Sequence, residues 1–373
     1  MAIKRQKVIL WGTGNVARQV MDNCETLDNY EILGFIDNNK NVVGGSFYGY
    51  KIYNPDILKK EYADIVVILN DRYEEIENQI HKCYPQYDTK IRHKFYFFLQ
   101  SLHRRYDNNC SNEIKELLEY ADNNGLAFFN YKFTEKYADM PIDCRYDRTN
   151  GLYYIIYNGK RMYLSRVYDT EDKVISYCRS ILLEQDSESP HKYLKDDFCV
   201  NNGDIIVDAG VAEGNFTLSV IDLISRAYLI EADVNWIEAL KYTFSDYKNK
   251  IELIPKYATS YDEGKFAKLD TIIHQPVNFI KMDIEGNEWD ALNGATNLIE
   301  QCPDLKMAIC TYHSDFDYEL ITDFVKNHGF DYEDSYGYMW FPVKVRQTTI
   351  STRVHHTLIR CSKNKSGVKD GIK

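Results

Sequence analysis

The residues best suited to chemistry lie in one short segment, where several carboxylates surround a single glycine. The segment reads Phe279-Ile-Lys281-Met-Asp283-Ile-Glu285-Gly286-Asn-Glu288. Its apolar start predicts a buried strand, and side chains just beyond the carboxyl end of a parallel strand face the ligand crevice of an α/β sheet. Carboxylates held this close repel one another unless a cation, a proton or another interaction stabilises them. Glu288 alone also suits a helix N-terminus, where acids are stabilised, whereas Asp283 and Glu285 are less easily explained by capping.

A glycine-rich turn lies upstream, directly after the apolar run 205–207. It reads Asp208-Ala-Gly210-Val-Ala212-Glu213-Gly214-Asn215. A dinucleotide places its pyrophosphate against backbone N–H groups at a helix N-terminus, which favours glycine as the first residue after the strand. That residue is Asp208, whose carboxylate repels phosphate but suits S-adenosylmethionine (SAM), a ligand with an ammonium and a sulfonium. The alternative interpretation is a tight α/β crossover that binds no ligand.

A second carboxylate follows the next predicted strand at Glu231, where it can accept hydrogen bonds from both hydroxyls of a ribose. Because SAM and NAD both carry such a ribose, Glu231 does not discriminate between them, whereas Asp208 does. The predicted cofactor-binding residues are Asp208, Gly210, Ala212, Glu213, Gly214, Asn215, Glu231, Ala232 and Asp283.

Methyl transfer from SAM is an in-line displacement, so the protein mainly positions the reacting groups. An alcohol is a poor nucleophile, and a base or a metal should assist it. The candidate catalytic residues are His313, Asp283, Glu285 and His191. Either histidine could instead serve only in packing or in a surface hydrogen bond. Asp283, Glu285 and His313 have the ligand types of an Mg²⁺ or Mn²⁺ site, but their spacing does not demand a divalent metal and we expect none.

The region from about 184 to 361 resembles the FkbM-type methyltransferases. The matching pieces are Glu184-Gln185, Ser189-Pro190-His191-Lys-Tyr193, Gly203-Asp204-x-x-Val207-Asp208-x-Gly210-x-x-Glu213-Gly214-Asn215-Phe216, Glu231, Leu269-Asp270-Thr271, Ile280-Lys281-x-Asp283-x-Glu285-Gly286-x-Glu288, Leu292-x-Gly294-Ala295 and Cys310-Thr311-Tyr312-His313. The piece at 281–288 is the most specific, whereas the first glycine motif alone indicates only a generic methyltransferase. Val211 and Ala212 depart slightly from the pairs found in many relatives.

This resemblance implies a SAM-dependent O-methyltransferase, because the family methylates hydroxyl groups, often on sugars or glycosylated natural products. We expect a small-molecule or glycan acceptor, with a sugar hydroxyl methylated in surface polysaccharide or glycoconjugate biosynthesis. Two alternatives stay open. One is an NAD-dependent or nucleotide-sugar-binding enzyme that uses the N-terminal segment, and the other is a non-catalytic SAM-binding assembly protein.

The elements that must position these residues follow from a regular alternation after residue 204. Strands are predicted at 205–207, 228–230, 251–254, 278–282 and 305–311, and helices at 215–224, 235–247 and from about 289 and 318. Two later extended stretches, 338–345 and 354–360, would complete a seven-stranded, Rossmann-like methyltransferase sheet. The predicted fold class is therefore α/β, with the methyltransferase domain at 184–361 and a disordered tail at 362–373.

A smaller Rossmann-like α/β domain is expected at residues 1–95. There Gly12-Thr-Gly14-Asn15 follows an apolar run and opens a helix, and Asp37 ends the next apolar run. Such a turn can hold a pyrophosphate on the helix N-terminus. The segment is similar to the N-terminal nucleotide-sugar-binding domains of certain sugar acetyltransferases, which implies a nucleotide-sugar site at Gly12, Gly14, Asn15 and Asp37. The alternative is a scaffold or oligomerisation domain without a ligand.

Residues 96–183 are expected to be a helical linker followed by a β-hairpin region. Helical spacing over 113–121 ends near Gly125, a suitable helix C-cap. Asn158-Gly159 is a strong signal for a type I′ hairpin turn. Thr170 can cap a helix that runs to about residue 183.

Composition limits the classes of partner. The 373 residues carry a formal net charge of −11, so a nucleic-acid partner is not expected. The nine cysteines form no disulfide or metal pattern, which favours a reducing, cytoplasmic location. No apolar stretch is long enough for a signal peptide or a transmembrane helix, so we expect no membrane insertion. The sequence does not fix the oligomeric state, and a homodimer is possible.

Overall fold

The chain divides into two compact units. The first comprises residues 1–131 with 340–354, and the second comprises residues 132–339 with 355–373. The computed structural model describes residues 5–60, 63–70, 72–106, 110–342 and 353–363. Positions 364–373 of the predicted tail and 343–345 of a predicted strand therefore lie outside the described residues. Within the described ranges, no helix is both long enough and apolar enough to span a membrane.

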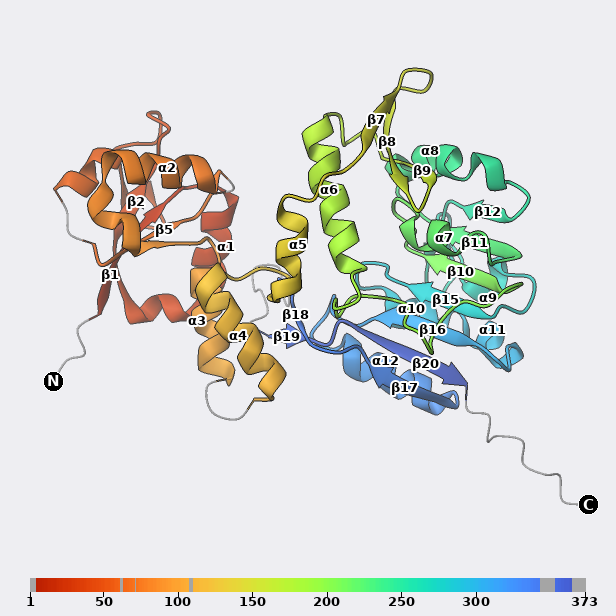
Figure 1. Cartoon of the computed structure of the whole chain (residues 1–373). Coiled ribbons are helices and arrows are strands. Elements are labelled where there is room, and N and C mark those ends of the chain that lie inside the picture. Colours follow the sequence, from red (N-terminus) through yellow and green to blue (C-terminus); the bar gives the residue numbers. More distant parts are fainter. Residues whose placement is uncertain (1–4, 61–62, 71, 107–109, 343–352, 364–373) are drawn as a thin grey trace, which may run out of the picture. The chain divides into compact units, whose positions relative to one another are not determined.

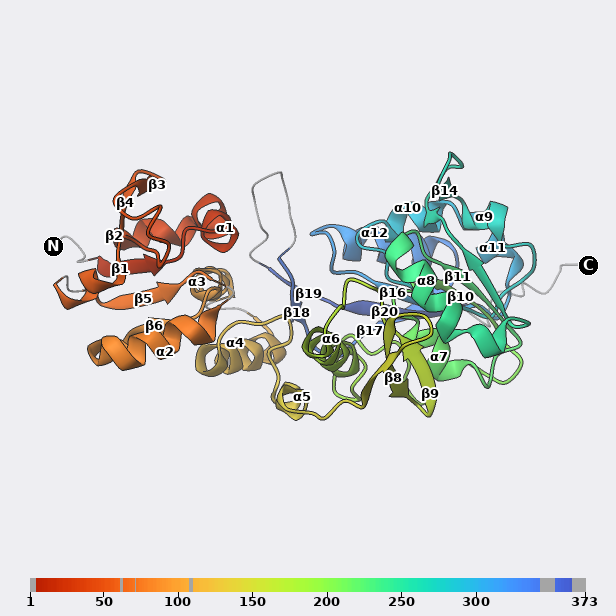
Figure 2. The same cartoon turned by 90° about the horizontal axis from the view of Figure 1, so that it is seen from above.

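The first unit (Figure 1) is built on a six-stranded sheet in the order β3-β4-β2-β1-β5-β6, and Figure 2 labels all six strands. Its strands are β1 (Gln6–Trp11), β2 (Tyr30–Ile36), β3 (Ser46–Phe47), β4 (Tyr50–Tyr53), β5 (Ile65–Ile68) and β6 (Ile91–Arg92). Every neighbouring pair is parallel except β3 and β4. Strand β5, which lies between β1 and β6, is buried along its whole length, because helices cover both faces of a parallel sheet.

The helices of the first unit are α1 (Asn15–Asn23), α2 (Tyr73–Cys83), α3 (Tyr96–Tyr106) and α4 (Asn112–Asn124). Helix α4 confirms the helix predicted over 113–121. It begins after Ser111, whose side chain accepts a hydrogen bond from the Ile114 amide, and it ends at Gly125, whose φ of +84° favours glycine. Its periodic apolar residues are buried, so packing rather than propensity alone stabilises it.

The second unit contains a seven-stranded sheet in the order β12-β11-β10-β15-β16-β20-β17. Its strands are β10 (Ile205–Ala209), β11 (Arg226–Ile230), β12 (Ile251–Ile254), β15 (Phe279–Met282), β16 (Lys306–Cys310), β17 (Phe330–Asp334) and β20 (Leu358–Lys363). All pairs are parallel except those of β20, which is antiparallel to both of its neighbours. The predicted α/β class with a seven-stranded sheet is confirmed.

One predicted strand of this sheet was wrong. The stretch 338–345 was expected to supply a late strand, but the sheet uses β17 instead. Within 338–345, Met339–Trp340 forms the short strand β18, which pairs with β19 (Val354–His355) in a separate ribbon. Strand β17 reads FDYED and buries only Phe330 fully. An edge strand exposes most of its side chains, so acidic residues obscure the apolar pattern by which strands are recognised.

Helices cover both faces of the large sheet (Figure 2). They are α7 (Asn215–Val220), α8 (Val234–Thr243), α9 (Leu269–Ile272), α10 (Glu288–Asn293), α11 (Thr296–Gln301) and α12 (Asp317–Asn327). On one face, buried side chains of α10–α12 pack against alternate sheet residues such as Ile280. On the other face, Phe216 of α7 stacks on Phe279, with ring centroids 5.7 Å apart. This arrangement brings the carboxyl ends of β10, β11, β15 and β16 to one edge of the sheet.

Upstream of this sheet lie α5 (Glu135–Ala138), a three-stranded sheet and α6 (Glu171–Glu184). The sheet contains β7 (Cys144–Asp147), β8 (Leu152–Tyr157) and β9 (Lys160–Tyr163). Asn158 and Gly159 both have positive φ angles, +49° and +75°, which confirms the predicted type I′ hairpin turn. The predicted cap of α6 is also confirmed, since the Thr170 side chain accepts a hydrogen bond from the Lys173 amide.

Candidate active site

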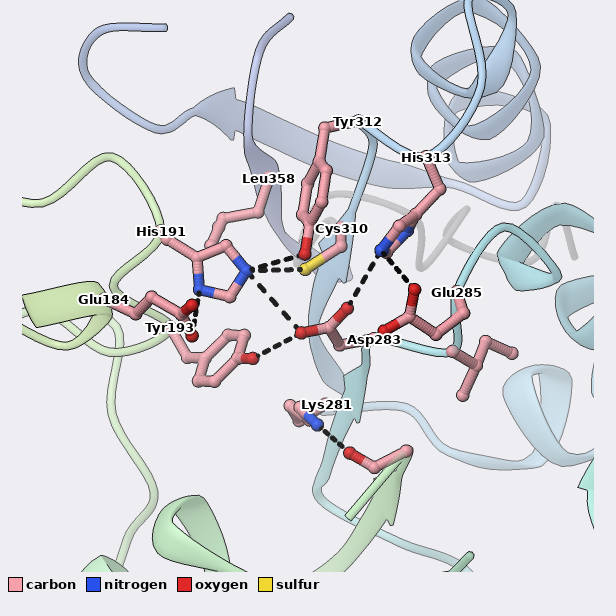
Figure 3. A network of polar contacts seen from close by, with 12 residues as sticks. Glu184, His191, Tyr193, Lys281, Asp283, Glu285, Cys310, Tyr312, His313 and Leu358 are labelled. Atoms are coloured by element: carbon pink, nitrogen blue, oxygen red, sulfur yellow. Dashed lines mark hydrogen bonds and ion pairs between the residues drawn. The ribbon is translucent and has the colours of Figure 1, made fainter. Parts of the chain in front are cut away.

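Asp283 lies at the centre of a polar network, directly after strand β15 (Figure 3). Its Oδ2 atom accepts a hydrogen bond from the Tyr193 hydroxyl at 2.7 Å and lies 3.5 Å from His191 Nε2. Its Oδ1 atom lies 3.5 Å from His313 Nε2. One carboxylate thus joins two histidines that come from distant parts of the sequence, one after α6 and one after β16.

His313 is surrounded by carboxylates. Its Nδ1 lies 3.0 Å from Oε1 of Glu288, which is fully buried, and its Nε2 lies 3.9 Å from Oε2 of Glu285. Burial alone would lower the pKa of His313, but the hydrogen bond to Glu288 and the charges of Glu288, Asp283 and Glu285 outweigh it and raise that pKa to about 9. At neutral pH His313 is therefore an imidazolium.

His191 has the opposite charge state. Its side chain is 2% exposed, and this burial lowers the pKa of His191 to about 4, although the charge of Asp283 opposes the shift. Burial would raise the pKa of Asp283, but His191, Lys281 and His313 lower it to about 2. At neutral pH an ionised carboxylate therefore stands between a neutral and a charged imidazole.

The glycine turn is tied to this network by a buried ion pair. Lys281 Nζ lies 3.2 Å from Asp208 Oδ1 and also donates hydrogen bonds to the carbonyl oxygens of Ala209 and Gly210. The other oxygen of Asp208 accepts from the Thr217 hydroxyl at 2.7 Å. Asp208 is 0% exposed, so its carboxylate neutralises Lys281 instead of facing a ligand. The predicted direct contact of Asp208 with a positively charged cofactor is therefore not what the geometry shows.

Two glycines of the turn are required by close packing. Gly210 has a φ of +76°, and a Cβ there would lie 1.7 Å from the carbonyl oxygen of Asp283. Gly214 has a φ of +87°, and a Cβ there would lie 2.9 Å from the ring of Phe244. The first glycine thus lets β10 approach the acidic segment, and the second lets α7 begin against α8.

A cavity of about 590 Å³ lies at this edge of the sheet and joins the turn to the acidic segment. Six of the predicted site residues line it, namely Gly210, Ala212, Glu231, Ala232, Asp283 and Glu285. Glu231 is held in place from two sides, since Oε2 accepts from the Ala212 amide at 2.9 Å and Oε1 from the Asp233 amide at 2.7 Å. Its carboxylate therefore links the turn to the end of β11.

Comparison with protein families decides what kind of domain surrounds this cavity. Residues 183–332 match the family described as the methyltransferase FkbM domain. The chain carries an FkbM methyltransferase domain. Residues 4–90, which lie in the first unit, match a different family, described as C2185-like, N-terminal.

Solved structures similar to the chain include other methyltransferases. Methyltransferase FkbM from Methylobacillus flagellatus is 15% identical, with 96% of this chain and 90% of that chain covered and a TM-score of 0.47. Magnesium protoporphyrin IX methyltransferase from Synechocystis, solved with bound SAM, is 11% identical, with 44% and 71% covered and a TM-score of 0.30. No curated protein matches the chain.

The FkbM methyltransferase domain places two strained residues in the cavity wall. Ala212 and Glu285 both have left-handed backbone conformations, with φ angles of +48° and +58°. Residues other than glycine rarely adopt this conformation, and such strain concentrates at functional sites. Four residues predicted to bind the cofactor do not line the cavity, namely the buried Asp208 and three residues that follow it. Glu213 is buried and accepts from the Tyr177 hydroxyl at 2.5 Å, while Gly214 and Asn215 form the start of α7.

Sequence reasoning missed the aromatic part of the cavity wall. Trp236 lies in the first turns of α8, and Tyr257, Tyr261 and Phe266 come from the ribbon of β13 (Tyr257–Ala258) and β14 (Phe266–Ala267). Strands of two residues have no detectable alternation, so no motif marks these side chains. Tyr193 was also missed as a site residue, although it belongs to the segment that resembled the family.

In the first unit, the four residues predicted to bind a nucleotide sugar lie at or next to the carboxyl ends of β1 and β2. Gly12 has a φ of +120°, and a Cβ there would lie 2.6 Å from the Leu69 carbonyl oxygen. Gly14 precedes α1, and Asn15 is its first residue. Both oxygens of Asp37 already accept hydrogen bonds, Oδ2 from the amide and hydroxyl of Thr13 and Oδ1 from the amide of Asn39. These bonds fix the turn itself.

Proposed function

We propose that this chain is a SAM-dependent O-methyltransferase that acts on a hydroxyl of a sugar or related polyol in surface polysaccharide or glycoconjugate biosynthesis. The observation that carries the proposal is one continuous cavity lined by Glu231 at one part and by Asp283 and Glu285 at another. Bound in this cavity, SAM would place its ribose at the carboxylate after the second strand and its methyl group near the acidic segment. The match of residues 183–332 to the methyltransferase FkbM domain supports this choice of cofactor.

The charge of the cavity also supports SAM. Its described lining includes five acids, Glu231, Asp233, Asp283, Glu285 and Asp290, and one lysine, Lys256. SAM carries a sulfonium and an ammonium against one carboxylate, whereas the product after methyl transfer has lost the sulfonium charge. An acidic cavity therefore favours the substrate form of the cofactor over the product form.

The transfer step needs a group that accepts the hydroxyl proton. His313 is already protonated at neutral pH, and Asp283, with a pKa of about 2, is a weak base. Glu285 lines the cavity with a side chain that is 88% exposed, so it can both reach the acceptor and exchange a proton with solvent. We assign proton acceptance to Glu285. The acceptor oxygen attacks the methyl carbon, the carbon–sulfur bond breaks with its electron pair going to sulfur, and the hydroxyl proton passes to Glu285.

An acceptor screen tests the proposal. The full chain is incubated with methyl-labelled SAM and a panel of free, nucleotide-linked and lipid-linked sugars. The proposal expects label in a methyl ether, which resists alkali and carries no charge. Label recovered as an alkali-labile methyl ester, or on an amine, would contradict O-methylation of a hydroxyl while leaving methyl transfer itself intact.

A further inference from the structure

Three side chains beside the cavity have the geometry of a cation site. Asp283, Glu288 and His313 each offer one ligand atom, and these atoms lie within 4.8 Å of one another. Glu288 Oε1 lies 3.0 Å from Nδ1 of His313, and Asp283 Oδ1 lies 3.5 Å from Nε2, so each carboxylate is close to one ring nitrogen and His313 would supply one of the two. Ligands held about 2.1 Å from an octahedral cation lie about 3 Å apart when they are adjacent. Small side-chain movements would therefore suffice to coordinate one ion.

The charges of these residues do not balance. The positive charge of Lys281 is taken up by Asp208, with which it forms a buried ion pair. The carboxylates of Asp283 and Glu288 then face one imidazole, that of His313, and a bound cation would replace the proton of the coordinating ring nitrogen. Asp317, 5% exposed, adds a fourth acid that interacts with Glu288 and His313. Buried carboxylates in excess of their counter-charges are stabilised by a proton or by a bound cation.

A free carboxylate oxygen in the cluster favours the bound cation. Glu288 is 0% exposed, and its Oε1 accepts from the Ile284 amide at 2.8 Å. Its Oε2 is buried too, and among the described residues it accepts no hydrogen bond. A buried oxygen of an ionised carboxylate is costly to leave without a partner. The other oxygen of the same carboxylate, Oε1, lies 3.0 Å from His313 Nδ1, so the unpaired oxygen belongs to a side chain of this cluster.

We propose that Asp283, Glu288 and His313 bind a divalent cation of the Mg²⁺ or Mn²⁺ class beside the methyl acceptor. The inference rests on the proposed function for the role of the ion but not for its binding. Asp283 lines the cavity, so the remaining coordination positions open toward the acceptor. A bound cation lowers the pKa of a coordinated hydroxyl and makes it a better nucleophile, and Glu285 accepts its proton as before.

A second set of residues competes for the assignment. His191, Asp283 and Cys310 also bring one ligand atom each within 4.8 Å of one another. This set contains a thiol, and burial together with the charges of Asp283 and Glu288 raises the pKa of Cys310, which disfavours the thiolate that a soft metal needs. The two sets share Asp283, so variants of Glu288 and Cys310 distinguish them.

Manganese provides the probe. The chelator-treated full chain is titrated with Mn²⁺ alone, and electron paramagnetic resonance measures the bound ion. In a second experiment, metal-free portions of the same protein are titrated calorimetrically with SAM in the presence of EDTA. We expect one Mn²⁺ per chain, nitrogen modulation of its spin echo from His313, at least tenfold weaker binding in Glu288→Gln, and unchanged Mn²⁺ binding in Cys310→Ala. Asp290→Asn, which removes one charge from the same cavity, serves as the matched control and should retain Mn²⁺.

Two outcomes overturn the proposal. One is the absence of stoichiometric Mn²⁺ binding by the wild-type chain, and the other is equal binding by the wild type and Glu288→Gln. The spin-echo measurement on the wild type needs no variant, so a Glu288 variant that fails to fold does not remove the test. Loss of SAM binding with Mn²⁺ binding retained would instead contradict the proposed function, so the two failures are distinguishable.

Discussion

Asp208 on β10 and Lys281 on β15 are register partners in the parallel sheet, and their side chains form a buried ion pair 3.2 Å long beneath the glycine turn. Lys281 also holds the carbonyl oxygens of that turn. The pair thus couples the floor of the proposed cofactor site to the segment that bears Asp283. The two opposite charges cancel in the protein interior, so each side chain stabilises the fold chiefly by neutralising the charge of the other.

We expect Lys281→Met to destabilise the protein by about 3–5 kcal/mol, because it leaves the Asp208 carboxylate buried without its counter-charge. The double variant Asp208→Asn with Lys281→Met removes both charges and should recover a large part of that loss. Urea unfolding of the wild type, both single variants and the double variant measures the coupling. A double variant whose loss of stability equals the sum of the two single losses would show that the pair carries no coupling energy.

Glu231→Gln should weaken SAM binding about 10- to 100-fold, as expected for losing one or two hydrogen bonds to a charged group. The amide cannot accept from the Ala212 amide, the Asp233 amide and a ribose as the carboxylate can. Calorimetric titration with SAM measures the change. Glu252→Gln is the matched control, since Glu252 lies on the neighbouring strand β12 in a surface ion pair with Arg226. Equal losses in both variants would contradict a ribose contact at Glu231.

The left-handed backbone of Glu285 leads to a prediction about both stability and activity. Its φ of +58° suits glycine, so Glu285→Gly should stabilise the fold by about 1 kcal/mol. The same change removes the proposed proton acceptor and should lower methyl transfer at least 100-fold. Glu285→Gln keeps the backbone strain and should lose activity without gaining stability. Thermal unfolding and the transfer rate are measured on both variants. Full activity in Glu285→Gln would exclude proton acceptance by this residue.

His313 makes stability depend on pH. Its pKa is about 9 in the folded metal-free protein and about 6.5 when unfolded, so its contribution is fully present below pH 6.5 and is lost as pH rises through 9. The shift corresponds to at most about 3 kcal/mol. The stability difference between wild type and His313→Asn, measured by urea unfolding in EDTA, should therefore shrink between pH 6 and pH 9.5. A difference that stays constant over this range would show that His313 is not held protonated.

Much of the fold and of the candidate site could be predicted from the sequence. The strand 205–207, the glycine turn and the acidic segment have strong local patterns, and parallel topology places their ends together. Six of the predicted residues therefore line one cavity at this edge. His191 follows helix α6 and His313 follows strand β16, far apart in the sequence, yet each places Nε2 3.5 Å from a carboxylate oxygen of Asp283.

The remaining features depend on register and packing, which local patterns do not contain. The direction of Asp208 is set by its pairing with Lys281 across two strands, so the turn motif alone suggested a ligand contact that the fold does not make. Glu288 suited a helix N-terminus in the sequence, but its carboxylate turns toward His313. Strand β17 escaped prediction because its acidic side chains mask a single buried Phe330.

The central claim is that the cavity lined by Glu231 and Asp283 binds SAM. Calorimetric titration of the full chain with SAM tests it most directly, with NAD titrated under the same conditions. We expect saturable binding of one SAM per chain and no saturable binding of NAD. A folded chain that binds NAD, or that shows no saturable binding of SAM, would contradict the assignment of this cavity to a methyl donor.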